Sequence, residues 1–366
     1  MLVIFYNDEV KTWDVIVIGG GIIGLSLAIA LRKRGTKVLV IERGEPGREA
    51  SHAAGGMLVD CELETHPALR DLAAASARMY PEFARELELE SGEKVDLRDQ
   101  GTIFAPSESH RERFYDEKVS ALRSDELASL EPQLVLDGRA AYFLNERSVD
   151  PRSLTYAAWQ TAKRRGVDFS SGDLVKEVNV SDGLVSGVTT NKTAFVAEKV
   201  VNCAGAWSGQ IPPIRFPTRP VKGQMLCLAL PSRNLLQHVV RTPEVYLIPR
   251  SDGRLLVGAT VEEAGFDKRT DGDTMQRLHH AALALVPELR NAKILENWAG
   301  LRPGTPDGLP ILGATNLPGY FVATGHFRDG ILLAPITAEV MADVVIGVEP
   351  EHDLAAFSPL RFANNS

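Results

Sequence analysis

The chain has 366 residues, of which 44% are hydrophobic and 24% are charged, and its formal net charge is −8. This length favours two domains or one large α/β assembly, and the composition is typical of a soluble globular protein. The negative balance, without any run rich in Lys and Arg, argues against a nucleic-acid partner because phosphate backbones require clustered cations.

Neither the cysteines nor the N-terminus indicates export or a metal centre. Cys61, Cys203 and Cys227 are widely spaced, and no C-x-x-C or H-E-x-x-H pattern occurs, so we expect neither a disulfide framework nor a metal site. The first residues, "MLVIFYNDEVKTW", hold only a five-residue apolar run and no basic segment, unlike a signal peptide. No apolar stretch reaches the ~20 residues that span a bilayer. We therefore expect a cytoplasmic protein.

The first predicted unit is strand, glycine turn, helix, strand. Residues 14–18 are apolar and β-branched, as in a parallel strand buried on both faces. A helix is predicted from Ile22 to Arg34, because basic residues occupy its last turn and Gly35 follows it. "KVLVIE" (37–42) is then a second buried strand. These elements form a βαβ unit.

The glycine turn carries a phosphate-binding pattern. Gly19, Gly21 and Gly24 form G-x-G-x-x-G between the strand and the helix. In this setting the first glycine makes the tight turn, the second admits a pyrophosphate, and the third lets the helix pack on the strand. Glu42 follows eighteen residues after Gly24, at a strand end suited to bind a ribose diol. The unit predicts a dinucleotide site.

The rest of the chain alternates between two kinds of structure without repeats or a low-complexity linker. Since βαβ elements occur at both ends, we predict one discontinuous α/β domain with antiparallel material inserted into it. The predicted helices are 65–91, 150–166 (with Asp150 as N-cap), 271–286 and 330–347, and the predicted strand regions are 101–107, 140–151, 177–203, 219–230, 244–260 and 319–324.

Several segments together resemble one family. These are the βαβ unit with "GGGIIG", "EASHAAGGML" (49–58), "VVNCAGAWS" (200–208), "GLRPGTPDGLPILG" (300–313) and "GHFRDGILLAP" (325–335). In this order they resemble the D-amino-acid-oxidase-like FAD-dependent oxidoreductases, and most of all the glycine oxidases of thiamine biosynthesis. The resemblance runs from Trp13 to Phe362.

The resemblance implies a fold of α/β plus antiparallel β. A Rossmann-like FAD-binding domain of the glutathione-reductase type would carry an inserted mixed-sheet substrate domain. We expect the FAD-binding domain to comprise residues 13–90, 150–218 and 296–366, and the substrate-binding domain residues 91–149 and 219–295. A homo-oligomer is also expected.

The resemblance further implies a noncovalent FAD, because the segment "AGLRPGTPDG" has no cysteine to which a flavin could attach. Val175 would lie beside the adenine, and the "NCAG" strand end (202–205) on the adenosine side. The residues expected to bind FAD are Gly19, Gly21, Ile22, Ile23, Gly24, Glu42, Arg43, Ser51, Ala53, Ala54, Gly55, Gly56, Met57, Val175, Ala204, Gly205, Gly300, Arg302, His326, Arg328, Asp329, Gly330, Ile331 and Leu332.

Two arginines between apolar runs are candidates for binding a substrate anion. A guanidinium can hold a carboxylate through two parallel hydrogen bonds. The resemblance assigns Arg302 as the main carboxylate ligand, with Tyr246 and Arg328 beside it. Each could instead serve the fold, through an internal ion pair or as a ring at the edge of the core. A helix starting at Gly330 and aimed at the flavin would stabilise negative charge on the reduced ring.

No acid–base catalytic set is apparent in the sequence, which fits a reaction carried by the flavin. The leading hypothesis is oxidation of glycine, or a similar small amine or amino acid, to the imine, with molecular oxygen as acceptor and hydrogen peroxide as product. The alternatives are a D-amino acid or sarcosine dehydrogenase that passes electrons to a quinone, a flavin-binding module without turnover, and a nicotinamide-dependent reductase. The last lacks a second G-x-G-x-x-G.

Overall fold

The computed structural model describes residues 11–60, 65–107 and 120–362, and two eight-stranded sheets organise them. In the first sheet five strands run parallel in the order β19-β12-β1-β2-β9. Two antiparallel strands, β11 and β10, extend the sheet from β12, and a third, β18, pairs antiparallel with β19. The parallel strands are β1 (Thr12–Ile18), β2 (Val38–Glu42), β9 (Asp168–Ser171), β12 (Ala194–Asn202) and β19 (Tyr320–Thr324), and the others are β10 (Val175–Ser181), β11 (Leu184–Thr190) and β18 (Ile311–Ala314).

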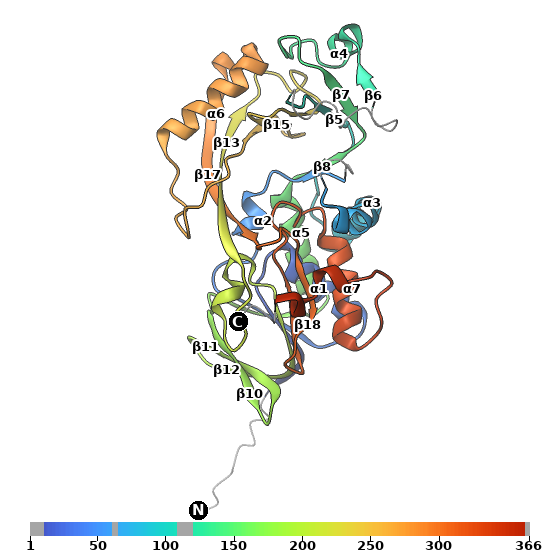
Figure 1. Ribbon diagram of the computed structural model, residues 1–366, viewed down its shortest axis with the longest axis vertical. Coiled ribbons are helices and arrows are strands. Elements are labelled where there is room, and N and C mark those ends of the chain that lie inside the picture. The colour runs from blue at the N-terminus through green and yellow to red at the C-terminus, as the bar shows by residue number, and fades with distance from the viewer. Residues whose placement is uncertain (1–10, 61–64, 108–119, 363–366) are drawn as a thin grey trace, which may run out of the picture.

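Helices cover one face of this sheet and form the largest apolar core with it. Helix α1 lies against α5 and α7, and α3 packs on both of these. Figure 1 shows α3 near the middle of the molecule and α1 and α7 below it. The helices are α1 (Ile22–Lys33), α3 (Arg70–Ser91), α5 (Pro151–Arg164) and α7 (Ala334–Ile346), with the short α2 (Ala50–Ala53) nearby.

The second sheet lies in the upper half of Figure 1 and has the strand order β17-β13-β16-β15-β14-β5-β7-β6. Its strands are β5 (Thr102–Phe104), β6 (Ser120–Leu122), β7 (Ala141–Leu144), β13 (Arg219–Ala229), β14 (Val239–Arg241), β15 (Tyr246–Pro249), β16 (Arg254–Gly258) and β17 (Lys293–Gly304). Helix α6 (Gly272–Leu285) covers one face, and α4 (Ser124–Leu130) lies at the far end. A third, small sheet has the strand order β3 (Met57–Leu58), β8 (Arg147–Val149) and β4 (Leu97–Arg98).

Side chains of the second sheet alternate between two environments. Leu226 and Leu228 of β13 belong to the core beneath α6, whereas Met225 and Cys227 point to the opposite face. This alternation is the two-residue period of a strand. The face away from α6 is therefore available to form a site between the two sheets.

The predicted fold class is confirmed: the chain is a mixed α/β protein with a parallel nucleotide-type sheet and a separate mixed sheet. The helix opened by Asp150 is also confirmed, because Asp150 Oδ1 accepts a hydrogen bond from the Arg152 amide at 2.9 Å. Strands β4 and β18, which have only two and four residues, were not predicted from the sequence.

Two predicted helix starts are wrong. The helix expected from residue 65 begins as α3 at Arg70, after a short 3₁₀ turn at Pro67–Leu69. The last helix begins at Ala334 and not at Gly330, and residues 330–333 form turns. The cause lies in α3, whose Tyr80 hydroxyl donates to the Ile331 carbonyl and whose Ser76 hydroxyl donates to the Leu332 carbonyl at 2.6 Å. These side-chain bonds hold the turn apart from the regular helical ladder.

Candidate active site

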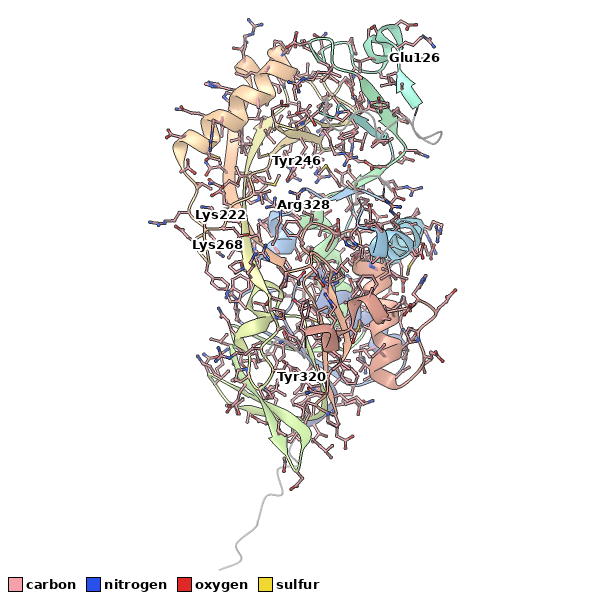
Figure 2. All side chains as sticks on the ribbon, viewed as in Figure 1. Glu126, Lys222, Tyr246, Lys268, Tyr320 and Arg328 are labelled. Carbon is pink, nitrogen blue, oxygen red and sulfur yellow. The ribbon has the colours of Figure 1, made fainter. Side chains whose placement is uncertain are left out.

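A cavity of about 800 Å³ lies between the two sheets and receives residues from both. This volume is near the upper end of the ~300–1,000 Å³ typical of small-molecule sites. Figure 2 shows Tyr246 of the second sheet above Arg328, which follows β19 of the first, in the middle of the molecule. The cavity therefore joins the glycine turn at one end to the candidate carboxylate ligands at the other.

The glycine turn fits a pyrophosphate. Gly19 has φ +106°, and a β-carbon there would lie 2.5 Å from the Cys203 carbonyl oxygen, so the turn itself requires glycine. A β-carbon at Gly21 would meet only the Ser51 hydroxyl, at 3.3 Å. The packing of the protein thus does not demand glycine at 21, whereas a ligand in the cavity would.

The N-terminus of α1 offers amides to an anion. Its N-cap residue Gly21 has no side chain to bond them, and the Ile22 amide donates to Ser51 Oγ at 2.9 Å. The first amides of a helix lack partners within the helix and carry its positive dipole end. A phosphate at this position would therefore be stabilised without a positively charged side chain.

Glu42 ends β2 at the edge of the same cavity, and its carboxylate is fixed in place. Oε2 accepts a hydrogen bond from the Gly20 amide at 2.8 Å, and Oε1 accepts one from the Gly44 amide at 2.9 Å. Each carboxylate oxygen can accept more than one hydrogen bond. The group therefore retains acceptors for two neighbouring hydroxyls of a ribose.

The small-residue loop forms another wall. A β-carbon at Gly56 would lie 2.0 Å from the Val149 carbonyl oxygen, and one at Gly300 would lie 2.4 Å from Ala53 Cβ. The loop is held from behind by Arg250, which is fully buried and donates to the Gly55 carbonyl. The packing of this wall itself therefore requires glycine at 56 and 300.

The second sheet contributes one row of residues across neighbouring strands. Pairing aligns Met225, Gly258, Tyr246, Arg241 and Phe104, and all five line the cavity. Paired residues on adjacent strands project to the same face. The row therefore forms the roof of the cavity.

The guanidinium of Arg302 reaches under this roof. Its Nη1 donates to the carbonyl oxygens of Thr260, at 3.1 Å, and Lys222, at 3.3 Å, and it interacts with the Tyr246 hydroxyl. Burial and the charge of Arg328 lower its pKa, and burial raises the pKa of Tyr246. In the part of the chain that the structure describes, no carboxylate forms an ion pair with Arg302. An anionic ligand would compensate this charge.

Arg328 is a second cation without a carboxylate partner among the described residues, and it lies over the Phe327 ring at 5.3 Å. The Phe327 amide donates to the Pro303 carbonyl at 3.0 Å, which links this loop to the strand that carries Arg302. By contrast, Arg241 is buried against Glu146, with Nη2 at 3.0 and 3.1 Å from the two carboxylate oxygens. The first two arginines are therefore the candidates for binding substrate.

Burial shifts the pKa values of two titratable groups near Arg328. Burial lowers the pKa of His326 to about 3, and its Nε2 lies 3.2 Å from Thr337 Oγ1. His326 is therefore neutral at physiological pH. Burial raises the pKa of Asp329 to about 6, while the charge of Arg328 opposes the shift.

Nearly all of the predicted site residues line this cavity. Gly24 and Leu332 do not. A β-carbon at Gly24 would lie 2.0 Å from the Gly19 carbonyl oxygen, so this glycine serves the contact between helix and turn. Leu332 is buried in the core beneath α7. The proposed ligand roles of the lining residues remain predictions.

Sequence reasoning missed the residues that only pairing brings to the cavity. Met225, Gly258 and Arg241 come from separate strands without a shared motif. Trp207 was also missed, although it lies only two residues after the "NCAG" segment. The alternation of strand residues could have suggested the roof only if the pairing of the strands had been known.

Other expectations concern metal ligands, cysteines and membrane-spanning helices. Among the described residues no group of His, Cys, Asp and Glu could hold a metal ion. Cys203 and Cys227 are buried free thiols, and Cys61 lies outside the described residues. No helix of the described segments is long and apolar enough to cross a bilayer.

Comparison with known proteins identifies the family. The model of the family "FAD dependent oxidoreductase" (DAO) matches residues 14–344. The chain belongs to this family. It is 34% identical over 366 residues to the glycine oxidase of Geobacillus kaustophilus, covering 95% of this chain and 97% of that protein. The crystal structure of a glycine oxidase from the same organism has a TM-score of 0.90 and 33% identity, covering 96% of this chain and 99% of the other.

A second relative is longer. The bifunctional protein ThiO/ThiG of Trichormus variabilis is 36% identical over 364 residues, which cover 96% of this chain. The chain spans 55% of the length of that relative. The resemblance stated from the motifs is thus confirmed, and the protein is an FAD-dependent oxidoreductase.

The residues of the cavity fit the cofactor of the family. Gly21 leaves room that the packing does not need, the amides at the start of α1 suit the pyrophosphate, and Glu42 suits the ribose. FAD supplies the redox chemistry when bound. Arg302, Tyr246 and Arg328, which we name the clamp, line the same cavity and would suit an anionic substrate.

Proposed function

We propose that the protein oxidises glycine, or a similarly small amino acid or amine, at its carbon–nitrogen bond. The substrate loses two electrons and two protons to become the imine, and molecular oxygen gains both to become hydrogen peroxide. Support comes from the two glycine oxidase comparisons and from the clamp at the second sheet. Thiamine biosynthesis would be the setting, as the resemblance implies.

The observation that carries this proposal is the fixed position and, among the described residues, the uncompensated charge of the Arg302 guanidinium. Two carbonyls fix its guanidinium in the cavity, and no carboxylate of the described residues forms an ion pair with it. A substrate carboxylate would take that place through the paired geometry that arginine offers. Tyr246 would add a hydrogen bond, and Arg328 would lie on the other side of the anion.

The chemical role of the protein is to bind and orient. A carboxylate held at Arg302 would place the substrate in the cavity that residues 53–57 also line. Bound FAD would supply the acceptor for the electrons and the hydrogen that leave the α-carbon. His326 is neutral and its Nε2 lies against Thr337, so it suits a packing role more than proton transfer. Correct placement would supply most of the rate gain.

Cofactor binding and substrate binding are assigned to different parts of the chain. We propose that residues 13–90, 150–218 and 296–366 hold FAD, and that 91–149 and 219–295 cover the substrate. Strand β17 starts at Lys293 and pairs along its length with β13, so it crosses the proposed boundary at 296. A homo-oligomer remains part of the proposal.

The alternative is a dehydrogenase for a D-amino acid or sarcosine that passes electrons to a quinone or another acceptor. An assay of the purified, FAD-loaded protein in air separates the two. Glycine, sarcosine and D-alanine are supplied without any added acceptor, and peroxide is measured. Peroxide at the rate of substrate loss supports the oxidase. Turnover that requires an added quinone, with flavin bleaching under anaerobic glycine, would favour the dehydrogenase, and no bleaching by any of the three would refute both.

A further inference from the structure

A loop from the second sheet reaches the cofactor side of the cavity. It connects β16 to α6 through residues 259–271. Its stem is tied to β13, because the backbones of Lys222 and Glu262 exchange two hydrogen bonds of 2.9 Å. The Lys222 ammonium also donates to the Arg269 carbonyl. Both ends of the loop are therefore anchored.

The tip of this loop contacts Trp207 and Glu49, which lie outside the second sheet. The rings of Phe266 and Trp207 lie 5.3 Å apart at 32°. The Lys268 ammonium lies 3.1 and 3.2 Å from the two carboxylate oxygens of Glu49. Figure 2 shows Lys268 on the same flank of the molecule as Lys222.

Arg43 joins these two contacts into a ring. Its guanidinium carbon lies 3.4 Å from the centre of the Trp207 ring, and its Nη2 donates to Glu49 Oε1 at 2.6 Å. The clasp, as we name it, is this ring of Arg43, Glu49, Lys268, Phe266 and Trp207. Its members come from three separate segments of the chain, so the ring closes only in the folded protein.

The clasp lies at the cofactor end of the cavity. Arg43, Glu49 and Trp207 line the cavity, and Arg43 directly follows Glu42. Phe266 and Lys268 do not line it; they pack against these three from outside. The outer pair would therefore restrain the inner three while the cofactor is bound.

We propose that the clasp retains FAD, with Lys268 and Phe266 as positioning residues that hold Arg43, Glu49 and Trp207 over its ribose end. Opening the clasp breaks one ion pair and one aromatic contact at once. An exposed ion pair contributes little alone, whereas a cation over a tryptophan and a network contribute more. FAD should leave more slowly while the ring is closed. The proposal rests on the FAD dependence of the family and not on the identity of the amine.

The test measures FAD release from the holoenzyme without substrate. The enzyme is diluted far below its cofactor affinity, and the fluorescence of released FAD is followed. We expect Lys268→Ala and Phe266→Ala each to speed release by about three- to tenfold, and the double variant by more. Because the ion pairs are partly exposed, higher salt should speed release from the wild type and have less effect on Lys268→Ala.

Arg269→Ala is the matched control. Arg269 lies in the same loop, but its side chain is 88% exposed and pairs only with Asp267 in the same loop, so release should stay at the wild-type rate. Wild-type rates in Lys268→Ala and Phe266→Ala would overturn the proposal, as would an equal acceleration in Arg269→Ala. If a variant does not fold, the salt dependence of wild-type release still decides. Failure of glycine oxidation would leave these rates unaffected, so the two proposals fail separately.

Discussion

The guanidinium of Arg302 lies against the bare backbone of Gly223 on the neighbouring strand. A β-carbon at Gly223 would come within 2.3 Å of Nη1 and 2.5 Å of Nη2. Gly258 does the same for Tyr246, since a β-carbon there would lie 2.8 Å from its ring. The positions of the Arg302 guanidinium and the Tyr246 ring therefore depend on the absence of side chains at Gly223 and Gly258.

Gly223→Ala should damage substrate binding and leave the cofactor in place. The new methyl group must displace the guanidinium, because atoms cannot approach to the distances found here. The two carbonyl bonds of Arg302 would be lost or lengthened. We expect KM for glycine to rise by roughly ten- to a hundredfold, equivalent to about 1.4–2.8 kcal/mol. Steady-state kinetics at saturating FAD would measure this.

Gly272→Ala is the control for that substitution. A β-carbon at Gly272, in the first turn of α6, would meet nothing within 4 Å. Kinetic parameters of Gly272→Ala should match those of the wild type. If Gly223→Ala also keeps its KM, the position of the Arg302 guanidinium does not matter for substrate.

Arg302→Lys should harm carboxylate substrates far more than amines without a carboxylate. Lysine keeps the charge and loses the two-pronged geometry. Loss of one or two strong hydrogen bonds should lower kcat/KM for glycine by an amount equivalent to about 2–4 kcal/mol. Arg328→Lys should show the same pattern with a smaller effect. Each variant is assayed with glycine and with a small amine that has no carboxylate, and its flavin content is measured. Equal losses on both substrates would assign the arginines to the flavin or the fold.

The local sequence predicts the βαβ unit because every element of it is encoded within thirty residues. Gly19 is needed by its own turn, and Glu42 ends its own strand. The roof of the cavity could not be predicted in this way. The alignment of Met225 with Gly258 and Tyr246 depends on pairing between strands that are distant in sequence. Long-range pairing leaves no local pattern beyond the alternation of side chains.

The start of α7 shows a second limit of the sequence. Gly330 follows a strand and precedes an apolar run, which is a common signal for a helix start. The hydroxyls of Ser76 and Tyr80 take the carbonyls of the following turn, and these residues lie some 250 positions earlier. Only the packed structure reveals such competition. The family motifs still predicted most residues of the cavity, because their glycines and arginines can be recognised without knowledge of the packing.

Glu42→Ala should weaken FAD binding. A hydrogen bond to a charged group contributes about 1.5–3 kcal/mol, so the dissociation constant should rise by roughly ten- to a hundredfold. The substitution also leaves the Gly20 and Gly44 amides without their acceptor. Titration of apoprotein with FAD measures affinity, and thermal unfolding of the apoprotein shows how much the turn itself has lost. An unchanged dissociation constant would show that the carboxylate serves only the turn.

FAD should be released intact when the protein is denatured. The segment 299–308 contains no cysteine, and the two described cysteines are buried free thiols, whose pKa values are raised by burial. Heat or acid treatment followed by centrifugation should leave the yellow colour in the supernatant. Flavin that stays with the precipitated polypeptide would contradict noncovalent binding.

Asp150→Asn should destabilise the protein at neutral pH and much less in acid. Asp150 joins the start of α5 to Arg254 of β16, with Oδ2 2.5 Å from Nη2. Burial alone would raise the pKa of Asp150, but the charges of Arg250 and Arg254 outweigh it and hold the pKa below its usual value. A lowered pKa stabilises the fold above the unfolded value of ~3.9 and ceases to do so as the pH falls through the folded value. Asparagine keeps the helix cap and removes the charge.

The free energy of unfolding at pH 7, measured with urea at saturating FAD, should fall by about 1–3 kcal/mol in Asp150→Asn, since Arg254 is partly exposed and keeps Asp252. The gap from the wild type should close as the pH drops below about 4, because the wild-type carboxylate then becomes neutral as well. Asp252→Asn removes the exposed partner of the same arginine and should cost less than about 1 kcal/mol. A gap that stays constant from pH 7 to acid would mean that Asp150 acts through the shape of its cap and not through its charge.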